Sequence, residues 1–330
     1  MLLSVERMGL LQRFKSFLYQ QMVKYQVILY LLPMLQPFAK YFAGTGSKGN
    51  HRITDKSGKS FPVCKLNGKL FPAFGLGRLQ TIPDVSIRRD DVLLGGYPKT
   101  GCHWVHEILH MLVNGKSELT KYGKGLGGMI DAIPDIILDS LSSPRVLNSH
   151  MLYDDLPKGV KEHRTKIVIT VRNPKDTVVS FYNHVRNLEE FYTYTGEFND
   201  YFDLWIEGNV DYGSYFDFYL SWDELLKNPE RHPVLLVKYE DIKAQPMENI
   251  KRIAQFLEVD VTDEFVAEIV EKTSFNSMKS KRAKDMSAKL FRKGKVGDWR
   301  NWLSEEQSEA IDKQWQKKMQ GCIYQPHYNE

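Results

Sequence analysis

Short, strongly apolar runs alternate along the chain with longer amphipathic stretches, whereas the segment from about residue 49 to residue 90 shows little periodicity. Four of the apolar runs read as buried strands, at residues 92–95, 145–148, 166–171 and 233–238, and helical patterns follow most of them. This alternation is typical of β-α-β units, which place parallel strands in one sheet with helices on both faces. The pattern predicts an α/β fold with a central parallel sheet flanked by helices, and ligands at the carboxyl edge of the sheet.

The first 45 residues differ from the rest of the chain. They carry five basic residues against one acidic residue, and their apolar positions recur at helical spacing up to Pro33. We therefore expect a basic amphipathic extension over residues 1–45, which either docks on the protein or a partner subunit or makes peripheral contact with an anionic membrane. The apolar run 27–39 contains two prolines and is too short to cross a bilayer, and no signal-peptide pattern stands out. Residues 46–330 are expected to form a single domain.

Composition narrows the classes of function. The 330 residues are 42% hydrophobic and 26% charged, with a formal net charge of +4, which is typical of a soluble globular protein and too mild to indicate a nucleic-acid partner. The three cysteines, Cys64, Cys102 and Cys322, show no C-x-x-C spacing and no neighbouring histidine cluster. The cysteines therefore predict a reducing, cytoplasmic location, and we expect neither a disulfide framework nor a metal site.

The first predicted strand runs into a small basic turn, Tyr97-Pro-Lys-Thr-Gly101, that opens directly into a helix. Backbone N–H groups at a helix start lack intrahelical partners and lie at the positive end of the helix dipole, and Lys99 adds a charge to them. The turn therefore predicts a P-loop-like cradle for a phosphate or sulfate. Its order differs from G-x-x-x-x-G-K-[S/T], in which the lysine follows the last glycine, and taken alone it could equally be a surface turn.

Two further basic groups occur where the pattern places the ligand edge. Arg172 follows the strand 166–171, and Ser180 lies two turns along the next predicted helix. Near the C-terminus, Arg292, Lys293 and Lys295 surround a glycine, as in loops that wrap a phosphate. Two separated basic sites predict a ligand that is phosphorylated at two points, although a surface ion pair and a solvated loop would explain each group alone.

His150 follows the strand 145–148 and is expected at the same edge. An imidazole can act as a general base there, because its ordinary pKa of about 6.5 lies near the working pH. A single histidine is more often structural. His150 is a candidate general base because it is expected beside the turn that carries Lys99.

Six motifs occur in one order over roughly residues 60 to 310, and together they resemble the cytosolic sulfotransferase family. They are Tyr97–Trp104, Ser143–His150, Arg172–Ser180, Gly208–Ser214, Lys238–Asp241 and Arg292–Trp299. The resemblance implies transfer of a sulfonate group from 3′-phosphoadenosine 5′-phosphosulfate (PAPS), which leaves the product PAP, to a hydroxyl or amine of a small acceptor without a metal ion.

The resemblance also implies roles for individual residues. It assigns His150 as the general base and Lys99 to the leaving group. The 5′-phosphosulfate would lie against Lys99, Thr100, Gly101, Cys102 and His103, and the 3′-phosphate against Arg172, Ser180, Arg292, Lys293 and Gly294. The adenine would be contacted by Trp104, Tyr239, Thr273 and Phe275.

Two departures from the family pattern bear on function. The family commonly has Lys-Thr-His where this chain has Asn148-Ser-His150, which removes a positive charge beside the reaction. The segment through which family members usually dimerise is degraded at residues 300–309, so the sequence leaves open whether the chain forms a homodimer.

The aromatic stretch 189–218 is either a wall for an apolar or aromatic acceptor or packing core. A catalytically weak or inactive nucleotide-binding relative is the alternative function.

Overall fold

The computed structural model describes residues 49–73, 75–120, 128–282 and 291–326, all within the unit Ser47–Glu330. The predicted extension over residues 1–45 lies outside the described residues, so the division of the chain at residue 45 stays a prediction. Among the described residues, no helix combines the length and apolar character needed to cross a membrane.

A four-stranded parallel sheet has the order β5-β4-β6-β7. The strands are β4 (Val92–Gly96), β5 (Val146–Ser149), β6 (Lys166–Val171) and β7 (Val234–Lys238), which confirms the four predicted strands. Leu93 lies opposite Leu147 on β5 and Ile167 on β6. Because all four strands run in the same direction, their carboxyl ends meet at one edge of the sheet.

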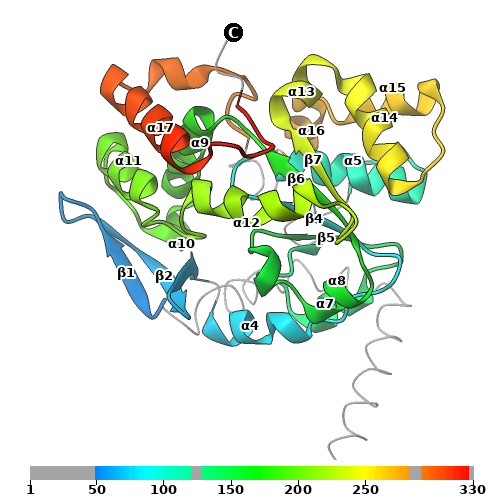
Figure 1. Ribbon diagram of the computed structural model, residues 1–330, viewed down its shortest axis with the longest axis horizontal. Coiled ribbons are helices and arrows are strands. Elements are labelled where there is room, and N and C mark those ends of the chain that lie inside the picture. The colour runs from blue at the N-terminus through cyan, green and yellow to red at the C-terminus, as the bar shows by residue number, and fades with distance from the viewer. Residues whose placement is uncertain (1–48, 74, 121–127, 283–290, 327–330) are drawn as a thin grey trace, which may run out of the picture. The chain divides into compact units, whose positions relative to one another are not determined.

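Alternate residues of the strands face two separate hydrophobic clusters. Leu93 and Ile169 belong to one cluster, together with side chains of α9 (Pro174–Asn187) and α12 (Tyr215–Lys227). Leu94 and Val168 belong to the other, with side chains of α5 (Cys102–Asn114) and α14 (Pro246–Leu257). In Figure 1 the sheet lies between α9 on one side and α5 and α14 on the other. The α/β fold with helices on both faces of a parallel sheet is thus confirmed.

The segment without clear periodicity holds a second, antiparallel sheet that the sequence analysis missed. Its strands are β1 (His51–Thr54), β2 (Ser60–Leu66) and β3 (Lys69–Pro72). Asn67 and Gly68 form the β2–β3 turn with φ values of 49° and 78°. Asn-Gly is the strongest short hairpin signal in a sequence, because both positions need a left-handed backbone, and it could have predicted this hairpin.

The other elements connect or cover the sheets. They are α4 (Leu76–Thr81), η2 (Ile82–Asp84), α7 (Asp135–Ser140), η3 (Tyr153–Asp155), α8 (Lys158–Glu162), α10 (Glu189–Tyr192), α11 (Phe198–Glu207), α13 (Tyr239–Ala244), α15 (Asp263–Lys272), α16 (Phe275–Arg282), η5 (Asp298–Asn301) and α17 (Glu305–Lys318).

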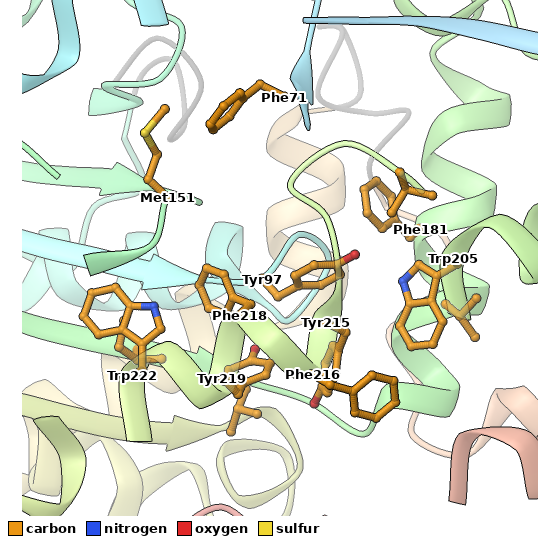
Figure 2. Packing of buried hydrophobic residues seen from close by; sticks show 14 of the residues in the cluster. Phe71, Tyr97, Met151, Phe181, Trp205, Tyr215, Phe216, Phe218, Tyr219 and Trp222 are labelled. Carbon is orange, nitrogen blue, oxygen red and sulfur yellow. The ribbon is translucent and has the colours of Figure 1, made fainter. Parts of the chain in front are cut away.

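The aromatic stretch 189–218 packs largely as core. Its buried rings join one continuous cluster that reaches the end of β4. Tyr97 meets Phe181, Tyr215 and Phe218 edge-on, at ring-centroid distances of 5.8, 5.4 and 5.9 Å (Figure 2). Edge-to-face contacts of this kind favour one ring orientation, so the residue that begins the basic turn is held rigidly.

Candidate active site

The carboxyl edge of the parallel sheet gathers the residues that the sequence placed there. The basic turn follows β4, His150 follows β5, Arg172 follows β6 and Tyr239 follows β7. Residues that are far apart in the chain therefore contribute to one site because the sheet brings their strand ends together.

The basic turn after β4 depends on two glycines. A Cβ on Gly96 would lie 2.1 Å from Thr170 Oγ1, and one on Gly101 would lie 2.9 Å from the Tyr239 ring. Lys99 adopts a left-handed φ of 74°, and Gly101 one of 102° at the N-cap of α5. A left-handed lysine costs about 1 kcal/mol, a strain that is typical of functional turns. The turn thus aims the start of α5 and the Lys99 side chain at the edge of the sheet.

The side chains of Thr100 and Cys102 hold the turn from the inside. The buried Thr100 hydroxyl donates to Tyr97 O at 2.7 Å and lies 2.9 Å from Thr170 Oγ1. Cys102 Sγ lies 3.1 Å from the same Thr170 oxygen. Because their side chains are engaged in these contacts, Thr100 and Cys102 offer an anion their backbone N–H groups. The half-buried His103 follows them in the first turn of α5.

The imidazole of His150 is buried, with 7% exposure, and has a defined tautomer. Its Nδ1 lies 2.6 Å from the Gly96 carbonyl oxygen. A carbonyl can only accept a hydrogen bond, so Nδ1 carries a proton, and in the neutral imidazole the lone pair is then on Nε2. The ring is thus oriented as a base by the same glycine at which β4 ends.

Asp131 fixes the end of β5, a role that sequence reasoning missed. This fully buried carboxylate accepts from Ser149 Oγ at 2.5 Å, from His150 N at 2.9 Å and from Tyr212 Oη at 2.9 Å. The Tyr212 ring lies 5.2 Å from the His150 ring, and its residue has a left-handed φ of 63°. No local pattern marks Asp131, because its partners come from distant segments.

Arg172 stands at the tip of β6 and meets the C-terminal basic loop. Its Nη2 donates to Lys295 O at 3.0 Å, and its guanidinium lies 4.5 Å from the centre of the Tyr239 ring. Burial raises the pKa of the Tyr239 hydroxyl, so that ring stays neutral beside the cation. Arg172 Nε is buried and makes no hydrogen bond. A buried donor without a partner is costly, and an anionic ligand at this edge would satisfy it.

Asp176, in the first turn of α9, docks the basic loop against the sheet. Its carboxylate accepts from Gly297 N at 2.7 Å and from Trp299 N at 3.1 Å, and it lies 3.7 Å from Arg172. No local sequence pattern marks this residue, because its partners Gly297 and Trp299 lie 121 and 123 residues away in the chain.

Arg292 and Lys293 share one carboxylate, Asp298. Lys293 Nζ donates to Asp298 Oδ1 at 2.7 Å, Arg292 donates to the other oxygen, and Asn301 adds a bond at 3.1 Å. Burial works against ionisation of this carboxylate, but the donors prevail and hold its pKa at about 2. The two cations are thereby fixed on the loop that Arg172 touches.

The loop also lies against Phe275, one of the predicted adenine residues. Gly294 has a left-handed φ of 63°, and a Cβ there would lie 2.4 Å from the Phe275 ring. The buried Thr273 donates to Ile269 O from both its hydroxyl, at 2.7 Å, and its N–H, at 2.9 Å. Across the site, the Trp104 and Tyr239 rings meet edge-on at 5.5 Å. Flat apolar surfaces next to two basic groups are suited to a purine.

The predicted residue Ser180 lies half-buried on α9, four residues after Asp176 and four before His184. These residues share one face of the helix. Lys99 Nζ lies 3.4 Å from His184 Nδ1, so this face extends from the basic loop to the basic turn.

Asn148 occupies the position where the family resemblance implies a lysine. It lies in β5 with 1% exposure, and neither Oδ1 nor Nδ2 makes a hydrogen bond. Within the described residues, no cluster of three or more His, Cys, Asp or Glu side chains could hold a metal ion.

Comparison with known proteins agrees with this geometry. The family model of the sulfotransferase domain matches residues 89–323. Sulfotransferase 6B1 of Danio rerio is 32% identical over 249 residues, which cover 74% of this chain and 83% of the relative. Mouse sulfotransferase SULT7A1 complexed with PAP is similar with a TM-score of 0.68 and 30% identity, over 79% of this chain and 96% of that one. Retinol dehydratase in complex with retinol and PAP shares the fold, with a TM-score of 0.67 and 18% identity over 87% and 95% of the two chains.

The chain therefore belongs to the sulfotransferase family, as its six motifs indicated. It is a PAPS-dependent sulfotransferase, and the predicted cofactor is confirmed. The glycine cradle of the basic turn and the orphaned Nε of Arg172 fit a ligand that is anionic at both ends.

Proposed function

We propose that this sulfotransferase sulfonates a hydroxyl or amine of a small apolar or aromatic acceptor, with His150 as general base and Lys99 at the leaving group. The observation that carries the proposal is the contact between His150 Nδ1 and the Gly96 carbonyl, 2.6 Å apart, at the residue where the strand enters the basic turn. A base oriented from the turn itself is held near any anion that the turn binds.

PAPS, when bound, supplies an activated sulfonate and a phosphate leaving group. His150 Nε2 takes the proton of the acceptor as the new bond to sulfur forms. Lys99 and the N–H groups at the start of α5 stabilise the negative charge that develops on the leaving oxygen. These groups act most strongly in the transition state, so they contribute to kcat more than to binding.

The remaining predicted residues would hold the two ends of the nucleotide. We assign the 3′-phosphate to Arg172, Ser180, Arg292, Lys293 and Gly294. The phosphosulfate would be held by Lys99, Thr100, Gly101, Cys102 and His103. The adenine would be held by Trp104, Tyr239, Thr273 and Phe275. The contact of Arg172 with the Lys295 carbonyl supports this assignment, because it joins the strand tip to the basic loop.

The surroundings of His150 support an apolar or aromatic acceptor. The Tyr212 ring lies against the imidazole, Phe71 meets Tyr212 edge-on at 6.1 Å, and the next residue, Met151, is buried. Aromatic side chains in this arrangement favour a ring or hydrocarbon over a strongly hydrated acceptor.

The test is to incubate the purified full-length chain with PAPS and a panel of phenols, alcohols and amines, without added metal, and to detect sulfonated product by mass spectrometry. We expect H150A to lower kcat by about a hundredfold or more while the Kd for PAP, from calorimetry, stays within about threefold. Full activity of H150A would refute the assignment of the base.

A second function, nucleotide binding with weak or no catalysis, is favoured by Asn148, whose buried amide stands where the family has a cation. Tight binding of PAP without product across the whole panel would support it. The same purified chain thus separates the two functions.

Cellular placement remains part of the proposal. Cys64, Cys102 and Cys322 are all unpaired in the structure, which supports a reducing, cytoplasmic compartment. A homodimer and a membrane contact through residues 1–45 stay predictions. Deletion of residues 1–45 followed by a liposome-flotation assay tests the second of these.

A further inference from the structure

The contact between Lys99 and His184 has a defined polarity. Lys99 Nζ lies 3.4 Å from His184 Nδ1. An ammonium group has donors and no acceptor, so the imidazole nitrogen must be the acceptor, and His184 is neutral when the contact forms. At this distance the bond is weak and contributes orientation rather than much stability.

Aromatic neighbours hold the His184 ring in place. The Tyr192 ring meets it edge-on at 5.6 Å, and Phe181 lies 6.2 Å away on the preceding turn of α9. His184 itself is half-buried. The His184 imidazole is therefore packed between Phe181 of its own helix, α9, and Tyr192 of α10.

The Gly208–Ser214 motif, which the assigned chemistry leaves unused, anchors this packing. Tyr192 Oη donates to Asp211 Oδ2 at 2.7 Å, and Asp211 is buried with 1% exposure. Two residues later, Gly213 O accepts from Tyr97 Oη at 2.8 Å. The motif thus holds both the tyrosine that starts the basic turn and the tyrosine that packs on His184.

We propose that His184 is a positioning residue that holds the Lys99 ammonium for the leaving group, with Tyr192 and Asp211 fixing the imidazole. The inference rests on the proposed function of Lys99. Lysine has a long flexible stem and a point charge, so its position must be set by its partners. A displacement of about 1 Å of such a group costs up to about a hundredfold in rate.

The experiment compares three variants of the full-length chain with wild type. H184F keeps a ring for Tyr192 and Phe181 but removes the acceptor. H184N restores an acceptor, because asparagine Oδ1 is as many bonds from Cα as histidine Nδ1. The matched control is H163F, at a half-buried histidine just before the amino end of β6, which is the opposite edge of the sheet.

We expect H184F to lower kcat for the best acceptor about tenfold, with the Kd for PAP changed less than threefold, and H184N and H163F to stay within threefold of wild type. The inference is overturned if H184F turns over like wild type, or if H184N is as impaired as H184F.

A second measurement needs no turnover, so it separates failure of this inference from failure of the proposed function. Acetylation of Lys99 by acetic anhydride is followed by peptide mass spectrometry in the absence of nucleotide. A hydrogen bond from the Lys99 ammonium to an acceptor at position 184 stabilises this unreactive, protonated form of the lysine. Lys99 in H184F is therefore expected to react severalfold faster than in wild type or H184N. Equal rates in all three proteins would overturn the inference.

Discussion

Replacement of Asp176 by alanine tests how the C-terminal basic loop is held at the sheet edge. The fully buried carboxylate accepts two backbone hydrogen bonds from the loop, at 2.7 and 3.1 Å, and faces Arg172 at 3.7 Å. Hydrogen bonds to a charged group contribute about 1.5–3 kcal/mol each. Removal of a buried charge offsets part of this loss, so we expect D176A to lower the free energy of unfolding by about 3 kcal/mol.

The same change should weaken nucleotide binding. Without Asp176 the backbone at Gly297 and Trp299 is released from α9, and the loop that carries Arg292 and Lys293 can move away from the sheet. We expect Tm to fall by roughly 6–12 °C, at about 2–4 °C per kcal/mol of lost unfolding free energy. The Kd for PAP should rise about tenfold or more, which corresponds to a loss of about 1.4 kcal/mol or more of binding free energy.

Calorimetry with PAP and thermal denaturation of the same samples make the assay. D176N, which keeps the volume and one acceptor oxygen, should lie between wild type and D176A. The matched control is D217N. The Asp217 carboxylate pairs with Lys318 at the surface, and its loss is expected to lower the free energy of unfolding by less than about 1 kcal/mol. A D176A protein that loses stability but binds PAP like wild type would refute the argument that Asp176 docks the loop for binding.

Three further changes have defined outcomes. R172K keeps the charge but loses the planar group that stacks on Tyr239, so the Kd for PAP by calorimetry should rise about tenfold; an unchanged Kd would place the phosphate elsewhere. Because the pKa of Asp298 is held at about 2, its ionised form stabilises the fold above about pH 4, and this contribution is lost as pH falls towards 2. D298N should remove that part of the pH dependence of urea unfolding, and identical profiles would contradict it. N148V replaces two buried polar atoms without partners and should raise the free energy of unfolding by about 1 kcal/mol, whereas a loss would show that the amide is satisfied.

Much of the site was predictable because its signals are local. A strand followed by a basic turn and a helix start is a short segment, so the place of Lys99 at the ligand edge followed from the pattern. The parallel sheet then implied that His150 and Arg172 lie at the same edge. The short strands of the antiparallel hairpin show little alternation, and the Asn67-Gly68 turn was the signal that could have predicted it.

The residues that orient the site could not be predicted, because their partners are remote in the chain. Asp176 and Gly297 are 121 residues apart, and Lys99 and His184 are 85 apart. No local sequence pattern around these residues predicts such contacts. A buried carboxylate looks like any other acidic helix position until packing removes its water.

The chain by itself determined which segments become strands, where the polypeptide turns and which charges stand at the turns, since these depend on the period of apolar side chains and on backbone preferences within a few residues. Tertiary structure alone decided which tautomer His150 adopts, which nitrogen receives Lys99 and which carboxylate anchors the basic loop. The physical reason is that a buried polar atom is costly unless it has a partner, and the available partners are known only once distant segments have packed together.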